Sequence, residues 1–308
     1  MLTRRAALSL LAGSLAFTGF IMPAAAQPPE KLKVVATFSI LGDLVRNVGG
    51  ERVEVTTLVG PNGDAHVYAP TPADGRRLTE ARIIFTNGLK FEGWIDRLVK
   101  SSGTRAAKIE AAKGAKLIEG DDDHHGHGHK HGHGIDPHAW QDIGNAKIYV
   151  GNIRDALIAA DAEGKAAYES NATAYLAKLD ALEGEVKGLV AGIPQERRRI
   201  ITSHDAFRYL GAAYGIAFVS PQGVSTEAEA SAKDVARIIQ QIKREKIAAV
   251  FVENVSDARL MERIAKETGA RIGERVYSDA LSEPDGPAGT YIDMMRHNIR
   301  AFSAALSS

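Results

Sequence analysis

The sequence predicts an α/β protein of two lobes, each a mainly parallel sheet flanked by helices, joined by one long rigid helix. In both halves of the chain, short apolar and β-branched runs alternate with stretches of helical periodicity. Between the halves, residues 163–190 carry apolar side chains at three- and four-residue intervals without a proline. The length of 308 residues, of which 44% are hydrophobic, is enough for two domains.

The first lobe is expected within residues 27–160. A buried strand at 31–40 leads into a helix at 41–48, which two glycines close. Thr71, followed by Pro72 and Asp74, is a helix start, with an N-cap hydroxyl, a proline in the first turn and a carboxylate three residues on. The other elements expected here are strands at 53–59 and 82–86 and helices at 71–81, 92–100 and 142–160.

The long helix lies within residues 161–193 and spans ~40 Å at the standard helical rise, so it can join two lobes stiffly. The second lobe is expected at 194–308, where the alternation of strands and helices restarts. Its expected strands are 198–202, 216–219, 247–252 and 270–277, and its expected helices are 206–214, 226–245, 257–268 and 290–306.

The N-terminus is typical of a cleaved signal peptide covering residues 1–26. Arg4 and Arg5 precede an apolar run at 6–21, and three alanines stand before Gln27. Sec export is favoured over twin-arginine export, and an uncleaved membrane anchor is the alternative. The chain has no cysteine, which excludes disulfides, lipid-modified cysteine and thiolate metal ligands. We therefore expect a soluble, non-lipidated protein of the periplasm.

A histidine-rich stretch at 121–134 begins with three aspartates, and its histidines are interspersed with glycine. Imidazole is a common ligand for transition metals, and this composition predicts a loop with weak, exchangeable metal sites rather than one tight site. We expect its binding to fade as the pH falls through about 6.5, where imidazole protonates. The six histidines concerned are His124, His125, His127, His129, His131 and His133. The formal net charge of zero offers no electrostatic argument for nucleic acid.

Outside that run, His66 and His204 each follow a predicted strand by a few residues, His138 follows a turn stiffened by proline, and Asp279 follows the last predicted strand. Ligands of open α/β sheets bind beyond the carboxyl ends of the strands, so these four can face one crevice. Taken singly, each also fits a plain structural role in a turn or a helix cap. His297, on the predicted last helix, is interpreted as a surface residue.

The segments around these residues closely resemble the four ligand segments of the bacterial zinc and manganese receptors that serve ABC importers. They are residues 63–74, 136–140, 202–207 and 277–281. The histidine-rich loop resembles that of the zinc members, and Ala69 departs from the pattern, where relatives often have Glu. The resemblance covers essentially the whole mature chain. It implies one tight metal site made by His66, His138, His204 and Asp279. It also implies delivery to an inner-membrane ABC permease with its ATPase. We expect a monomer, with a periplasmic zinc chaperone as a further candidate partner.

The ligand set favours Zn²⁺, because manganese-type relatives carry a carboxylate at the third position, where this chain has His204. Four protein ligands leave no position for a reactive water, which favours zinc capture over catalysis, so we do not expect an enzyme. The alternatives are a manganese receptor, a periplasmic zinc buffer and a zinc-dependent hydrolase. No HExxH motif supports a hydrolase, and Glu253, the one candidate for a base, is just as readily an acid behind the metal ligands or a structural acid.

Overall fold

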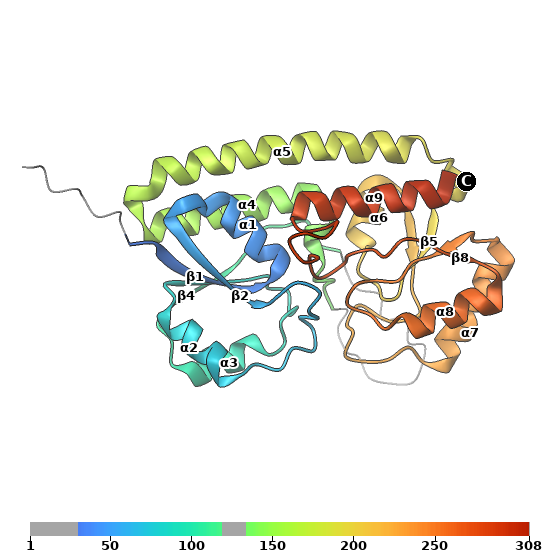
Figure 1. Cartoon of the computed structure of the whole chain (residues 1–308), viewed down its shortest axis with the longest axis horizontal. Coiled ribbons are helices and arrows are strands. Elements are labelled where there is room, and N and C mark those ends of the chain that lie inside the picture. Colours follow the sequence, from blue (N-terminus) through green and yellow to red (C-terminus); the bar gives the residue numbers. More distant parts are fainter. Residues whose placement is uncertain (1–29, 119–133, 308) are drawn as a thin grey trace, which may run out of the picture. The chain divides into compact units, whose positions relative to one another are not determined.

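The first sheet consists of parallel strands with helices packed around them. The computed structural model describes residues 30–118 and 134–307, and its strand order in the first sheet is β2-β1-β3-β4. All three pairings are parallel (Figure 1). The strands are β1 Leu32–Phe38, β2 Val53–Val59, β3 Ile83–Thr86 and β4 Ala107–Glu110. The helices that follow the first three strands are α1 Ser39–Gly49, α2 Pro72–Glu80 and α3 Ile95–Ser102.

The sequence explains these elements locally. The last five residues of β1 are buried on both faces, as expected for an interior parallel strand. The predicted capping box at the start of α2 is present. The Thr71 side chain accepts a hydrogen bond from the backbone N–H of Asp74, and the Asp74 side chain accepts one from the backbone N–H of Thr71.

The second sheet repeats the arrangement of the first. Its order is β6-β5-β7-β8, again all parallel, so the first two strands of each lobe occupy equivalent places. The strands are short: β5 Arg199–Ile201, β6 Ala217–Val219, β7 Ala249–Val250 and β8 Arg271–Ile272. The flanking helices are α6 Arg208–Tyr214, α7 Ala232–Glu245 and α8 Ala258–Thr268. The apolar residues between β5, β7, α7 and α8 form a second hydrophobic core, separate from the main one.

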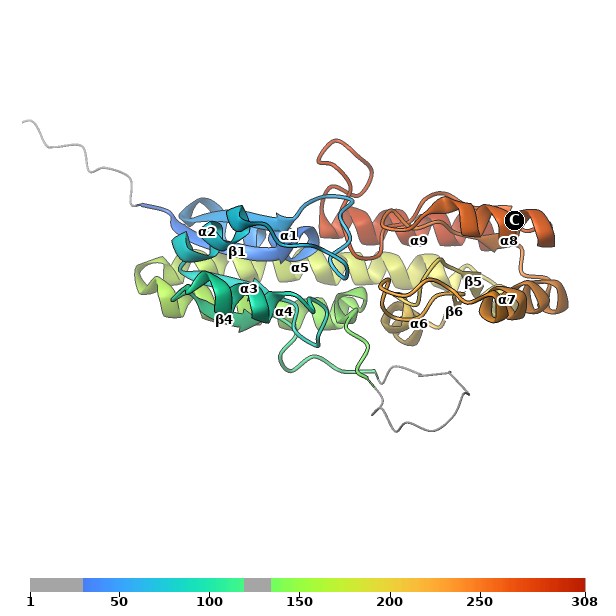
Figure 2. The same cartoon turned by 90° about the horizontal axis from the view of Figure 1, so that it is seen from below.

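The predicted connecting helix is α5, Lys165–Ala191, and it follows α4, Ile143–Ala160. Its buried side chains form a stripe from Tyr168 to Val190 at intervals of three and four residues. It contacts α1, α4, α6 and the last helix, α9 Tyr291–Ser307. Figure 2 shows α5 between α1 and α9 on one side and α4 and α6 on the other. The two sheets belong to one compact unit that begins at Lys31. The predicted fold class is therefore confirmed.

Short 3-10 turns complete the described chain, at η1 Gly50–Arg52, η2 Ala139–Gln141, η3 Ala162–Gly164 and η4 Gln195–Arg197. Among the described residues, none of the helices combines the length and apolarity needed to span a bilayer. The expected signal peptide at 1–26 and the histidine run from His124 to His133 lie outside the described residues.

Four details of the sequence-based expectation were wrong. Strand β4 was missed because its lysine and glutamate are exposed at a sheet edge and give no apolar alternation. Helix α3 begins at Ile95 rather than 92, because the buried Glu92 carboxylate accepts bonds from Thr37 and the Asn87 backbone. Helix α7 begins at Ala232 rather than 226, with Ser231 as its N-cap. The expected strand 270–277 is only β8 and one bridge between Glu253 and Val276.

Candidate metal centre

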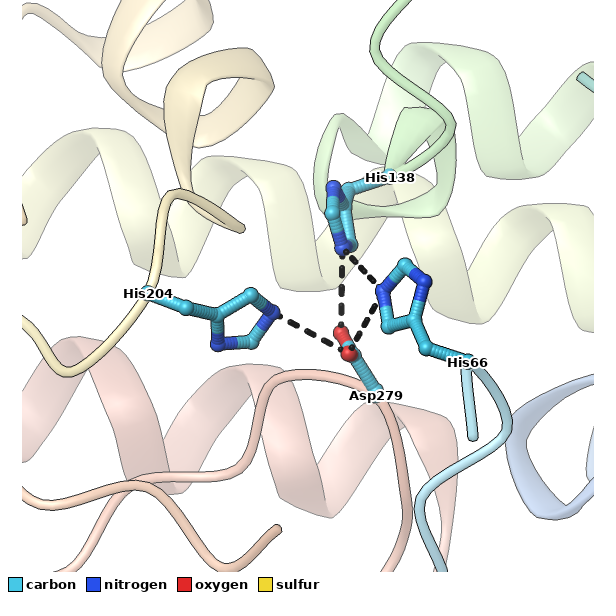
Figure 3. Close-up of side chains that lie close together, drawn as sticks. All are labelled: His66, His138, His204 and Asp279. Atoms are coloured by element: carbon cyan, nitrogen blue, oxygen red, sulfur yellow. Dashed lines mark hydrogen bonds and ion pairs between the residues drawn. The ribbon is translucent and has the colours of Figure 1, made fainter. Parts of the chain in front are cut away.

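The structure brings together the four side chains that the sequence analysis singled out. One ligand atom of each of His66, His138, His204 and Asp279 lies within 4.8 Å of the others. His66 follows β2, His138 precedes η2, His204 follows β5 and Asp279 follows the last bridge of the second sheet. Figure 3 shows the three rings pointing at the carboxylate from different directions. His297 is not in this cluster, since its Nε2 lies 2.8 Å from the Arg275 carbonyl oxygen.

The distances suit a small ion with short bonds. Nε2 of His66 lies 3.3 Å from Nε2 of His138 and 3.3 Å from Oδ2 of Asp279. Nε2 of His138 lies 3.4 Å from Oδ1 of Asp279, and Nε2 of His204 lies 3.1 Å from Oδ2. An ion that bonds tetrahedral donors at roughly 2.0–2.1 Å separates neighbouring donors by about 3.3 Å. The donor atoms therefore already stand near the spacing that such an ion requires.

The centre is buried, and its carboxylate lacks well-aligned hydrogen-bond donors. His138, His204 and Asp279 are fully buried, and His66 is 6% exposed. Within the described part of the chain, neither oxygen of Asp279 accepts a well-aligned hydrogen bond. The Nε2 atoms of the three histidines face this carboxylate. A buried carboxylate without hydrogen bonds is costly unless a positive charge compensates it. A divalent cation bound by the same three nitrogens would supply that charge.

Electrostatics within the cluster favour a charged state when no ion is bound. Burial lowers the pKa of His138, but Asp279 and Asp136 outweigh burial and raise it to about 9. Burial also lowers the pKa of His204, yet Glu253 and Asp279 raise it well above its usual value. Burial raises the pKa of Asp279, but His204 and His138 hold it well below the usual range. In the metal-free protein, protons on the imidazoles therefore supply the positive charge that a bound cation would provide.

Residues of the first lobe hold the loop that carries Asp279. The carbonyl oxygen of Ser278, next to Asp279, accepts hydrogen bonds from the side chains of Trp140 and Gln141. The backbone N–H of Leu281 donates to the Ser39 hydroxyl at 2.9 Å. Asp279 follows the second sheet in sequence, yet residues of the first lobe hold its loop.

Sequence reasoning assigned no role to Asp64 and Asp136, and it named Glu253 as a candidate base or structural acid without pairing it with His204. Asp64 and Asp136 each stand two residues before a histidine of the cluster, and each accepts a hydrogen bond from that histidine's backbone N–H. Glu253 accepts the backbone N–H of His204 at 2.9 Å. The repeated Asp-x-His spacing is a sequence signal for the first two. No such sequence signal pairs Glu253 with His204, because β7, which precedes Glu253, lies next to β5 only in the folded sheet.

Comparisons with known proteins agree with this architecture. Residues 34–305 match the model of the family described as the periplasmic component A of the zinc-uptake complex, ZnuA. The chain belongs to this family. It is a substrate-binding protein of a metal ABC transporter, and members of the family are solute-binding receptors rather than enzymes. They work with an ABC permease and its ATPase.

The receptor's relatives differ in the metal that their names give. It is 37% identical over 279 residues to the manganese-binding lipoprotein MntA of Halalkalibacterium halodurans, covering 90% of this chain and 89% of that protein. A periplasmic zinc binding protein, TroA from Treponema pallidum, has a structure that matches with a TM-score of 0.82 and 28% identity, over 90% of this chain and all of that one. A manganese-bound periplasmic metal binding protein from Candidatus Liberibacter asiaticus matches with a TM-score of 0.79, 31% identity and the same coverage. The printed names of these relatives thus divide between manganese and zinc.

Several relatives are named lipoproteins, and the sequence of this receptor contains no cysteine.

Proposed function

We propose that the receptor binds Zn²⁺ in the periplasm, between its two lobes, and hands it to an inner-membrane permease. His66, His138 and His204 would each give Nε2 to the ion, and Asp279 would give a carboxylate oxygen. The observation that carries this proposal is a buried set of three imidazole nitrogens and one carboxylate, whose ligand atoms lie within 4.8 Å of one another. Nitrogen-rich sets of four suit zinc, whereas manganese prefers more oxygen ligands.

A manganese receptor is the second candidate, and one feature of the site favours it. Both oxygens of Asp279 face ring nitrogens, Oδ1 toward His138 and Oδ2 toward His66 and His204. A bidentate carboxylate would raise the number of donors to five, which suits a larger ion. The names of several relatives point the same way.

The histidine run and the N-terminus complete the proposal. His124 to His133 would collect zinc weakly, and residues 1–26 would be removed after export. We further propose that the receptor is a monomer and that a periplasmic zinc chaperone can deliver to it. These parts rest on the sequence alone.

Metal identity is best tested by physiology together with coordination number. Zinc displaces manganese from most imidazole sites whatever the natural cargo, so displacement in a titration decides little. We expect a strain that lacks the receptor to stop growing under zinc chelation and to recover with added zinc but not with added manganese. X-ray absorption of the zinc-loaded protein should show four light ligands and no bound water. Recovery with manganese alone would make manganese the cargo, and unchanged uptake of radioactive zinc would favour a buffer without a transporter.

The affinity of the tight site is expected to rise with pH. Metal binds neutral imidazole, but in the metal-free protein His138 keeps its proton up to a pKa of about 9 and the pKa of His204 lies well above its usual value. Each displaced proton makes affinity rise about tenfold per pH unit below that pKa. Chelator competition from about pH 6 to about pH 8 would measure this slope. Its part above about pH 7 is diagnostic, because an ordinary imidazole is already neutral there. Affinity that is flat across this interval would contradict the predicted proton displacement.

A further inference from the structure

Two fully buried acids lie behind the proposed ligands, on the side away from the ion. Oδ1 of Asp136 lies 2.7 Å from Nδ1 of His138 and also accepts the backbone N–H of His138 at 3.0 Å. One carboxylate oxygen therefore contacts both the ring and the main chain of the same histidine. Both residues are 0% exposed.

Glu253, three residues after the end of β7, contacts His204 in a similar way. Its Oε1 accepts the backbone N–H of His204 at 2.9 Å, and its Oε2 lies 2.5 Å from the ring Nδ1. The second contact is close but is not aligned as a hydrogen bond. Glu253 is fully buried and pairs with Val276, three residues before Asp279. The acid is thus tied to the same sheet that leads to the fourth ligand.

His66 provides an internal contrast. Its backbone N–H donates to Oδ1 of Asp64 at 2.9 Å, but Oδ2 of Asp64 accepts the hydroxyl of Thr226 instead of contacting the ring. Among residues 30–118 and 134–307, no carboxylate contacts Nδ1 of His66. Its ring instead lies edge-on against Phe91, with centroids 4.6 Å apart.

A neutral imidazole carries one N–H, so a carboxylate that accepts it at Nδ1 leaves the lone pair of Nε2 directed at the ion. The same bond fixes the ring orientation and makes Nε2 a better donor. We propose that Asp136 and Glu253 are positioning residues that hold His138 and His204 as Nε2 ligands. This inference rests on the proposed function, since it concerns the ligands of the same ion.

Amide variants test the inference because they keep shape and remove the charged acceptor. In Asp136→Asn and Glu253→Gln, one side-chain oxygen remains and the other becomes an NH₂ group. Where this NH₂ group faces Nδ1, it donates a hydrogen bond to Nδ1 and so favours the tautomer with its proton on Nε2, which leaves no lone pair there for the ion. We expect the dissociation constant for zinc, measured against a chromophoric chelator, to rise about 10–100-fold in each variant. In ¹H–¹⁵N spectra of the zinc-loaded wild type, His138 and His204 should show a protonated Nδ1 and a metal-bound Nε2. The variant's own histidine should lose the hydrogen-bonded Nδ1–H signal.

Asp43→Asn is the matched control. Asp43 is also a buried acid of the first lobe, but it accepts the backbone N–H of Tyr291 and the Asn47 side chain, away from the four ligands. It should lower the unfolding temperature without changing zinc affinity. Asp136→Glu and Glu253→Asp keep a carboxylate and should retain more zinc affinity than the amide variants. They also provide the test if an amide variant folds poorly.

Three outcomes would overturn the inference: wild-type affinity in both amide variants, an equal loss of affinity in Asp43→Asn, or an unchanged Nδ1–H signal in a weakened variant. A wild-type protein that binds neither zinc nor manganese tightly would instead count against the proposed function.

Discussion

Replacing His138 by alanine is expected to lower zinc affinity by about 10²–10³-fold. Structural zinc sites bind with roughly 10–16 kcal/mol, so one of four donors contributes about 3–4 kcal/mol. The loss also leaves Asp136 and Asp279 buried without the ring that lies between them. Chelator competition at neutral pH would measure the effect. His66→Ala and His204→Ala should behave similarly, and Asp279→Ala should cost somewhat less.

Two controls separate the tight site from the other histidines. His297→Ala removes an imidazole that contacts the Arg275 carbonyl oxygen and Tyr277, and it should leave affinity unchanged. Deleting residues 124–133 should remove the weak extra sites and preserve one tight site. If the deletion abolished tight binding while His138→Ala kept it, the assignment of the four ligands would be wrong.

The fold was largely readable from the sequence because its strongest signals are local. Consecutive buried residues in β1, the capping box of α2 and the long apolar stripe of α5 each follow from periodicity. Signals weakened where strands are short or exposed, as in β4 and β8. Thr226 shows a second cause, since it looked like the start of a helix but its hydroxyl binds Asp64 in the other lobe.

The site was only partly readable. Placement after strands made His66 and Asp279 candidates for one crevice, but each alone fitted a turn or a cap better. The resemblance of whole segments gave the set of four ligands. The acids behind the rings were harder to find. Glu253 contacts His204 across 49 residues of sequence through the pairing of two strands, and side-chain pairing of that kind depends on sheet register.

Trp140 is expected to show the largest stability effect next to the site. Its ring is fully buried, and its centroid lies 5.1 Å from that of Phe38, 4.9 Å from Phe91 and 5.3 Å from His138. Its Nε1–H donates to the carbonyl oxygen of Ser278 at 3.1 Å. Trp140→Ala should therefore destabilise the metal-free protein by about 3–5 kcal/mol in urea unfolding.

The same substitution should also weaken zinc binding, because Trp140 lies between the turn that carries His138 and the loop that carries Asp279. Trp140→Phe keeps most of the packing and loses the bond to Ser278, so it should cost about 1 kcal/mol. Leu179→Ala, in the buried stripe of α5, is the matched core truncation and should cost about 2–5 kcal/mol without changing affinity. Equal losses of zinc affinity in Trp140→Ala and Leu179→Ala would mean that affinity follows global stability. A loss confined to Trp140→Ala would mean that this indole holds two ligands of the centre at the required distance.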